Sequence, residues 1–205
     1  NNLGAAYFQM GRYPDALATY HRSIEILPSA AAFSSLVTVH FFLRNYAEAV
    51  AMFEKGTALR PNDPRMWGNL GDAYRWTPGI EEKAAATLDR AITMQQELLS
   101  LNPKNAEGWS DLAGWLAKRG RSREAVEAIR RALKLNPKDV GFMAAAGRVY
   151  HLAGMRAKAL EWLQRAVESG YNPRELLGDP ELRLLHSTTL FQSMITDADR
   201  NTTGM

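Results

Sequence analysis

The 205-residue chain has no cysteine, which excludes disulfide bonds and thiolate metal sites but does not choose a compartment. It also has no run of roughly 18 apolar residues, the length that a membrane-spanning helix needs. Its 25 Lys and Arg against 22 Asp and Glu give a formal charge of +3, too small an excess to predict binding to nucleic acid or a membrane. The chain begins at Asn1 without an initiator Met or a signal peptide, so we expect a processed form or a piece of a longer protein.

Enzyme motifs are missing as well. The segment 68–71, Gly-Asn-Leu-Gly, follows a predicted helix stop rather than a strand and lacks the Gly-Lys-Ser/Thr of a phosphate loop. Helix–helix contact explains its Gly71 better. The four histidines are scattered, and none has a second ligand four residues on. We therefore expect no catalytic residue, no cofactor and no metal site.

The densest charge on the chain is a basic cluster between Lys118 and Lys134. Glu124 and Glu127 interleave with its arginines and can pair with them at helical spacing. Nucleic-acid binding would favour aromatic residues among the basic ones, and none is interleaved there. We interpret the cluster as a solvated helix face.

What the sequence does contain is a pattern that recurs along most of the chain. Each copy has a Leu-Gly-like pair, then an aromatic residue or Leu, then small residues, and it ends near a proline. The terminal prolines, Pro28, Pro61, Pro103 and Pro137, are separated by 33, 42 and 34 residues. The pairs are Leu3-Gly4, Leu70-Gly71, Leu112-Ala113 and Ala146-Gly147, with a weaker copy at Leu36-Val37. Self-similarity at this period predicts stacked helical hairpins.

Glycines and alanines divide each copy into two helices. Gly11, Gly120 and Gly154 lie where a first helix must end, which predicts a left-handed glycine cap. Small residues then begin the buried stripe of the second helix, where they allow two helices to approach closely: Ala16, Ala49, Ala84, Ala125 and Ala159.

Two regions depart from the repeat. The third copy has a second helix predicted over 80–101 with one continuous apolar face, which is either a docking edge or only a structural variant. After Gly170 the period ends, and Asn172-Pro173 and Asp179-Pro180 are helix-start signals. We expect residues 171–196 to form helices that cap the last hairpin, and 197–205 to be a frayed polar tail.

The pattern resembles the tetratricopeptide repeat family, whose units carry Trp-Leu-Gly-Tyr in the first helix and Ala-Phe-Ala-Pro in the second. The resemblance covers five units, 1–29, 30–63, 64–105, 106–139 and 140–170. The second unit departs from it, because Val37 and His40 replace the Gly and the Tyr. The resemblance implies an all-α fold, a right-handed superhelical solenoid of about five hairpins with a C-terminal capping helix.

In that family the first helices line a concave surface where extended peptides commonly bind. Aromatic side chains beside guanidinium groups could hold a segment with apolar and acidic residues. The candidate groove residues are Phe41, Phe42, Arg65, Asn69, Asp72, Arg75, Trp76, Asp111 and Arg148. In the alternative interpretation, Phe41, Phe42 and Trp76 only pack between adjacent hairpins.

Chaperone-binding members of the family grip a terminal carboxylate with a Lys/Asn/Asn/Lys/Arg clamp. The clamp positions of units one to three fall here on Asn1, Ala5, Ser35, Arg65 and Asn69, and those of units two to four on Ser34, Thr38, Asn69, Glu107 and Asp111. Neither set makes the clamp. We therefore do not expect a receptor for chaperone tails.

Three features resemble a narrower group, the C-terminal repeat regions of bacterial multidomain signalling proteins. They are the segment 71–79, the lengthened third unit, and the segment 168–173 followed by Asp-Pro-Glu-Leu. That resemblance implies a non-catalytic protein–protein interaction scaffold, which we expect in the cytoplasm, with the periplasm as the alternative. In such proteins an adenylate cyclase, Ser/Thr kinase or winged-helix domain comes first.

Two other functions stay open. The repeats could guide substrates of a larger enzyme such as a glycosyltransferase. They could also mediate self-association through an open N-terminal edge, where Leu3, Tyr7 and Tyr20 would expose apolar surface.

Overall fold

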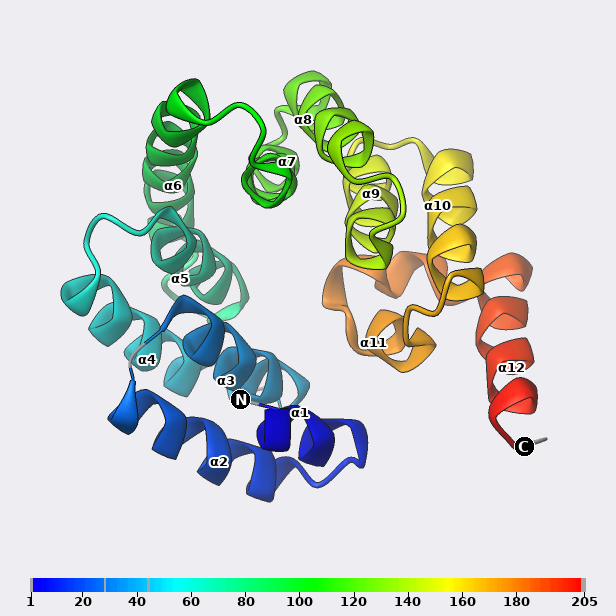
Figure 1. The fold of residues 1–205 in the computed structure, drawn as a ribbon, viewed down its shortest axis with the longest axis horizontal. Helices are drawn as coiled ribbons and strands as arrows, with labels where there is room; N and C mark the ends of the chain where they lie inside the picture. The colour runs from blue at the N-terminus through cyan, green and yellow to red at the C-terminus, as the bar shows by residue number, and fades with distance from the viewer. Residues whose placement is uncertain (1, 28, 44, 204–205) are drawn as a thin grey trace. The chain divides into compact units, whose positions relative to one another are not determined.

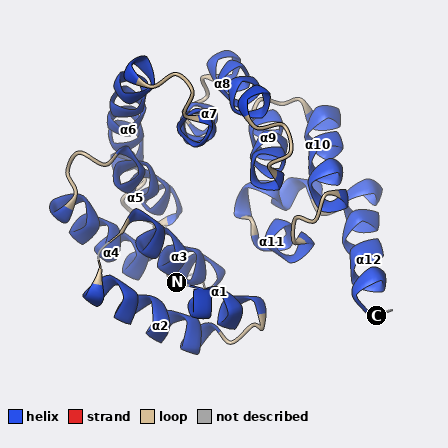
Figure 2. Ribbon diagram, viewed as in Figure 1, coloured by secondary structure: helices blue, strands red, loops and turns tan. Residues whose placement is uncertain are grey.

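A computed structural model describes residues 2–27, 29–43 and 45–203 (Figure 1). Within these residues the secondary structure is helical, with no strand (Figure 2). The all-α prediction is confirmed. The chain divides into two compact units, Asn1–Gln95 and Gln96–Met205, and each is described by itself.

The first unit is built from consecutive helices. They are α1 (Asn2–Gln9), α2 (Tyr13–Ile26), α3 (Ala30–Phe42), α4 (Tyr46–Leu59), α5 (Pro64–Trp76) and most of α6 (Glu82–Leu101). From α1 to α5 each helix packs on the next, and α3 also contacts α5. Phe33, Phe53 and Met66 are fully buried in the core between α3, α4 and α5.

The second unit follows the same plan and then changes. Its helices are α7 (Ala106–Lys118), α8 (Ser122–Leu135), α9 (Val140–Leu152), α10 (Arg156–Glu168), α11 (Pro173–Gly178), the 3-10 helix η1 (Pro180–Leu185) and α12 (Thr189–Thr203). From α7 to α10 each helix packs on the next, and α7 also contacts α9.

The glycine of the Leu-Gly pair lets the two helices of a hairpin touch. A Cβ atom on Gly71 of α5 would lie 2.7 Å from Leu88 of α6, and one on Gly147 of α9 would lie 2.4 Å from Leu163 of α10. Because real Cβ atoms do not approach other atoms so closely, a larger residue at either position would force Leu88 or Leu163 to shift. Helix–helix contact, predicted for Gly71, is confirmed.

The turns between α1 and α2, between α7 and α8 and between α9 and α10 are each made by a left-handed glycine. Gly11, Gly120 and Gly154 have φ of 73°, 72° and 77°, which glycine adopts without steric cost. After Gly120, the N–H of Arg121 donates to the carbonyl oxygen of Leu116 at 2.9 Å, as in a Schellman cap. The predicted glycine caps are confirmed.

The predicted long helix of the third copy is present as α6, with 20 residues. It begins at Glu82 rather than Ile80, because the left-handed Gly79 (φ 86°) ends the preceding turn. Its predicted apolar face is only partly buried: Leu88 is 1% exposed, whereas Leu98 is 46% exposed.

The segment after α10 packs back on the last hairpin. η1 contacts α9, and α12 contacts α10. Five apolar side chains of this segment are buried, namely Leu176, Leu182, Leu185, Phe191 and Met194. Asn172 and Asp179 accept hydrogen bonds from the N–H groups of Arg174 and Glu181 at 3.0 and 2.9 Å, so both predicted helix starts are confirmed.

Helix α12 extends further than the sequence led us to expect. We expected a tail from residue 197, but the helix continues to Thr203. The stretch 197–203 contains no Gly or Pro that would end it. The last two residues of the expected tail lie outside the described part of the chain.

Candidate functional site

Five of the candidate groove residues lie on α5. Asp63 caps the helix, because its carboxylate accepts a hydrogen bond from the N–H of Arg65 at 3.0 Å, and Pro64 starts its first turn. The spacing i, i+4, i+7 and i+11 places Arg65, Asn69, Asp72 and Trp76 along one side of the helix. All four are half-buried. The other sides of α5 bury Met66, Leu70, Ala73 and Tyr74.

The C-terminal end of α5 carries a guanidinium held between a carboxylate and an indole. Arg75 Nη1 lies 3.8 Å from Asp72 Oδ1, with the two side chains 25% and 20% exposed. The guanidinium carbon of Arg75 is 5.7 Å from the centre of the Trp76 ring, within cation–π distance. These contacts give the Arg75 side chain fixed neighbours at the protein surface.

Trp76 also contacts the preceding hairpin. Its ring stacks with that of Tyr46, at the start of α4, with centroids 6.5 Å apart and planes 26° from parallel. The alternative interpretation, packing between adjacent hairpins, therefore accounts for part of the Trp76 surface. The half-buried remainder can still touch a partner.

Phe41 and Phe42 belong to α3, which contacts α5. Their side chains lie outside the described part of the structure. Their place in a groove stays a prediction.

The two remaining candidates lie in the second unit. Asp111 is half-buried on α7. Arg148 on α9 donates from Nη1 to Asp179 Oδ2 at 3.2 Å, where the side chains are 30% and 15% exposed. Asp179 and Tyr171 both raise the pKa of Arg148, so two residues of the segment after α10 act on this arginine.

Tyr171 extends that network. Burial raises the pKa of the Tyr171 hydroxyl, while Arg148 lowers it and Glu175 raises it. A neutral hydroxyl can accept from the guanidinium and donate to the carboxylate. The sequence predicted the cap at Asp179 but carried no indication that its second oxygen pairs with a residue 31 positions earlier.

At the N-terminal edge the structure corrects one expectation. Tyr20 was expected to expose apolar surface, but it is 4% exposed because it packs on Gly4 of α1. Leu3 is 58% exposed. Tyr7 is half-buried beneath Arg12, whose guanidinium carbon is 4.6 Å from the ring centre.

The basic cluster of α8 is partly neutralised along the helix. Arg121 forms a short ion pair with Glu124, with a closest contact of 2.6 Å, and Arg123 lies 3.8 Å from Glu127. Hydrogen bonding from Arg121 lowers the pKa of Glu124. The predicted pairing of the interleaved glutamates is confirmed.

Two features are absent from the described part of the chain. None of the helices described is long and apolar enough to cross a membrane. Among those same residues, no group of three His, Asp or Glu side chains gathers where it could hold a metal ion.

Known proteins resemble the chain in sequence and in fold. Protein O-mannosyl-transferase TMTC1 of Homo sapiens is 25% identical over 199 residues, covering 82% of this chain and 22% of that protein. The Hsp70-Hsp90 organizing protein of Triticum aestivum is 32% identical over 114 residues, covering 55% of this chain and 18% of that protein. The chain thus spans about a fifth of the length of these two relatives.

Among solved structures, TTC0263, a TPR protein of Thermus thermophilus, superposes with a TM-score of 0.61 at 21% identity. The match covers 95% of this chain and 96% of that one, and it supports the fold alone. Two tetratricopeptide repeat models match the sequence, one over residues 1–29 and the other over 34–98 and 111–173. The chain therefore belongs to the tetratricopeptide repeat family.

Proposed function

We propose that this protein-interaction scaffold binds an extended segment of a partner protein along the α5 face defined by Arg65, Asn69, Asp72, Arg75 and Trp76. One observation carries the proposal: four of these side chains follow a single side of α5 and are half-buried. Half-burial fixes their positions and leaves part of each available to a ligand. The scaffold itself does no chemistry.

The chemistry of this face defines the segment it would accept. Arg65 and Arg75 favour carboxylates, which a guanidinium can bind through two parallel hydrogen bonds. Trp76 offers an apolar surface of the kind that dominates binding energy at interfaces. Asn69 can both donate to and accept from a peptide backbone. An extended segment with acidic and apolar residues satisfies all three.

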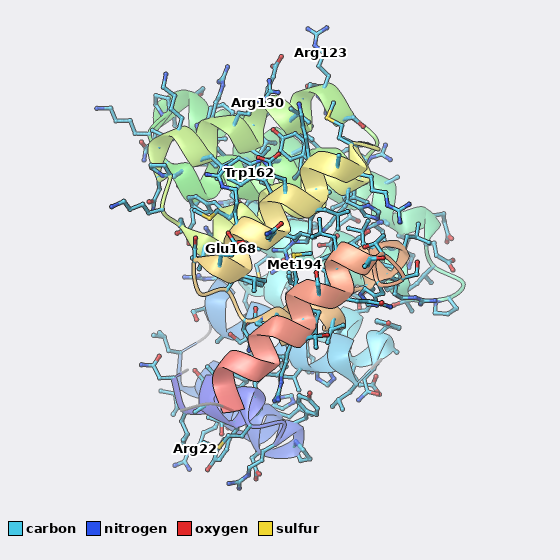
Figure 3. All side chains as sticks on the ribbon, turned by 90° about the vertical axis from the view of Figure 1, so that its right-hand side faces the viewer. Arg22, Arg123, Arg130, Trp162, Glu168 and Met194 are labelled. Carbon is cyan, nitrogen blue, oxygen red and sulfur yellow. The ribbon has the colours of Figure 1, made fainter. Side chains whose placement is uncertain are left out.

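The test uses a peptide selected on the intact chain from a random dodecapeptide display library. Its affinity is then measured by fluorescence anisotropy for Arg65→Glu and for the Arg75→Glu/Trp76→Ala double variant. We expect each to weaken binding about tenfold or more. The matched control is Arg22→Glu, which makes the same charge change at an exposed residue of α2 (labelled in Figure 3). Equal affinities for Arg65→Glu and Arg22→Glu would overturn the proposal.

The wider role that fits the sequence is the C-terminal module of a bacterial signalling or regulatory protein in the cytoplasm. Its support is the narrower resemblance of segments 71–79 and 168–173 and the lengthened α6. Catalysis would then belong to a different domain of that protein. Reading the complete gene tests this role, because an upstream cyclase, kinase or winged-helix domain supports it and a glycosyltransferase domain contradicts it.

A second candidate is a substrate-guiding repeat region of a larger enzyme. The similarity to protein O-mannosyl-transferase TMTC1, over 82% of this chain, favours it. If the full protein transfers sugars, Arg65→Glu should reduce transfer to a protein acceptor more than transfer to a short acceptor peptide. An equal reduction for both acceptors would contradict a guiding role.

A further inference from the structure

Two tyrosines at the same place in their hairpins have opposite electrostatic surroundings. In the first unit, the hydroxyl of Tyr74 donates to Glu54 Oε1 at 2.9 Å. Lys83 Nζ lies 5.7 Å from the centre of the same ring. Burial, together with Glu54, raises the pKa of Tyr74 to about 12. The result is a trio of carboxylate, hydroxyl and ammonium group.

In the second unit the carboxylate of this trio is replaced by a guanidinium. The residue 20 positions before Tyr150 is Arg130, just as Glu54 stands 20 positions before Tyr74. Arg130 Nε donates to the hydroxyl oxygen of Tyr150 at 3.4 Å. Lys158 Nζ lies 5.8 Å from the ring centre. Two cations therefore stand at one buried tyrosine.

This second trio has hydrogen-bond donors and lacks an anion. A guanidinium and an ammonium group cannot accept hydrogen bonds. The hydroxyl of Tyr150 therefore cannot donate a hydrogen bond to Arg130 or to Lys158. Among the described residues, neither Arg130 nor Lys158 forms an ion pair. Glu127, the carboxylate nearest to Arg130 along α8, lies instead beside Arg123.

We propose that Arg130, Lys158 and the Tyr150 hydroxyl form a docking site for a carboxylate side chain on an acidic segment of a partner protein. Both cations are exposed, and Arg130 lies on α8, on the face of the second unit turned to the viewer in Figure 3. The first unit supplies the precedent for a carboxylate, because Glu54 already occupies the equivalent place beside a tyrosine and a lysine. A partner's carboxylate would complete the trio and pair with both cations.

The surrounding charge favours the same kind of ligand. Residues 118–138 contain eight Lys and Arg against two Glu and no Asp. Such an excess raises the local concentration of acidic ligands and speeds their association. The site is made by α8, α9 and α10, and it does not depend on binding at α5.

The test titrates a fluorescein-labelled hexaglutamate peptide into the whole chain and follows fluorescence anisotropy at low salt. Arg130→Glu replaces an attractive charge by a repulsive one and should weaken binding about tenfold. Lys158→Met should weaken it about threefold. Arg123→Glu carries the same charge change on a side chain 93% exposed outside the trio, and it should stay within about twofold of the parent chain. Thermal unfolding of each variant checks that it is folded.

Three outcomes of these titrations would contradict the proposed carboxylate site. Equal weakening by Arg123→Glu and Arg130→Glu would reduce it to diffuse attraction, and unchanged binding by both Arg130→Glu and Lys158→Met would remove it. A phosphoserine peptide of equal length and charge that displaces hexaglutamate at lower concentration would assign the site to phosphate instead. A converse variant, Glu54→Arg, builds the same trio in the first unit and should raise the calorimetric stoichiometry by one peptide per chain. An unchanged stoichiometry would break the equivalence of the two tyrosines.

Discussion

The same helix position has different partners in α5 and in α9. Asp72 directly follows the close-contact glycine of α5, and Arg148 directly follows that of α9. Asp72 pairs with Arg75, three residues further along its own helix. Arg148 pairs with Asp179, 31 residues away in the cap. The aspartate of the first helix face therefore pairs within its own helix, whereas the arginine of the other face pairs with the chain's C-terminal segment.

Of the substitutions that test this comparison, removal of a buried side chain in the C-terminal segment should change the free energy of unfolding most. Leu182 of η1 is fully buried, so Leu182→Ala should lower the free energy of unfolding by about 2–5 kcal/mol. Leu184, in the same short helix, is 78% exposed, and Leu184→Ala should change it by less than about 0.5 kcal/mol. Urea denaturation measures both. Equal losses would mean that η1 is not packed on α9 as described.

Adding a methyl group where α9 approaches α10 closely should cause the next largest loss of unfolding free energy. A Cβ at position 147 would lie 2.4 Å from Leu163, so Gly147→Ala should cost about 1–3 kcal/mol of unfolding free energy. Gly114, inside α7, has no such neighbour within 4 Å, and Gly114→Ala should instead stabilise by about 0.5–1 kcal/mol. Thermal and urea unfolding measure whether each variant is less or more stable than the parent chain. A stabilising Gly147→Ala would refute the close approach of α9 and α10.

The first unit should lose stability in acid because of His40. Burial lowers the pKa of His40, and so does the nearby His21, while Glu48 raises it. Neither ring nitrogen of this 6% exposed side chain has a hydrogen-bond partner. The unfolded chain therefore takes up a proton that the folded chain does not bind. Stability should be complete above about pH 6.5 and fall below it, by at most about 1.4 kcal/mol per pH unit.

His40→Leu is the matched variant, because Leu116 fills the corresponding place in the fourth copy. It should reduce the pH dependence of urea unfolding between pH 5 and 7. A residual slope of the same sign is expected from His151, whose pKa burial also lowers. An unchanged slope in His40→Leu would contradict this account of acid sensitivity.

The ion pairs Arg148–Asp179 and Arg75–Asp72 should contribute differently to the free energy of unfolding, which neutralising each carboxylate would measure. Asp179→Asn preserves the helix cap, since Asn is an equally good capping residue, but it removes the charge beside Arg148 and should cost about 1 kcal/mol. Asp72→Asn removes a pair within one helix and should cost about 0.5 kcal/mol or less. Both are read from urea midpoints. A larger loss for Asp72→Asn would reverse the comparison.

Local features of the fold could be predicted from the sequence, and long-range pairings could not. The glycine caps, the start signals at Asn172 and Asp179 and the contact at Gly71 each depend on a few neighbouring residues. The ion pair of Arg148 with Asp179 and the stacking of Trp76 on Tyr46 join separate helices. No residue spacing in the sequence predicts either contact. The exchange of Glu54 for Arg130 lies between these cases. Aligning the copies exposes the exchange, but only the structure shows that both side chains reach a tyrosine hydroxyl.

Amide hydrogen exchange with and without a selected dodecapeptide tests the α5 proposal most directly. Saturating peptide should slow exchange over α5 and the start of α6, because a ligand on the α5 face stabilises that hairpin against local opening. The segment 180–185, which already contacts α9, the corresponding helix of the last hairpin, should exchange at the same rate with and without peptide. Protection confined to α9 and the cap, with α5 unchanged, would contradict the account.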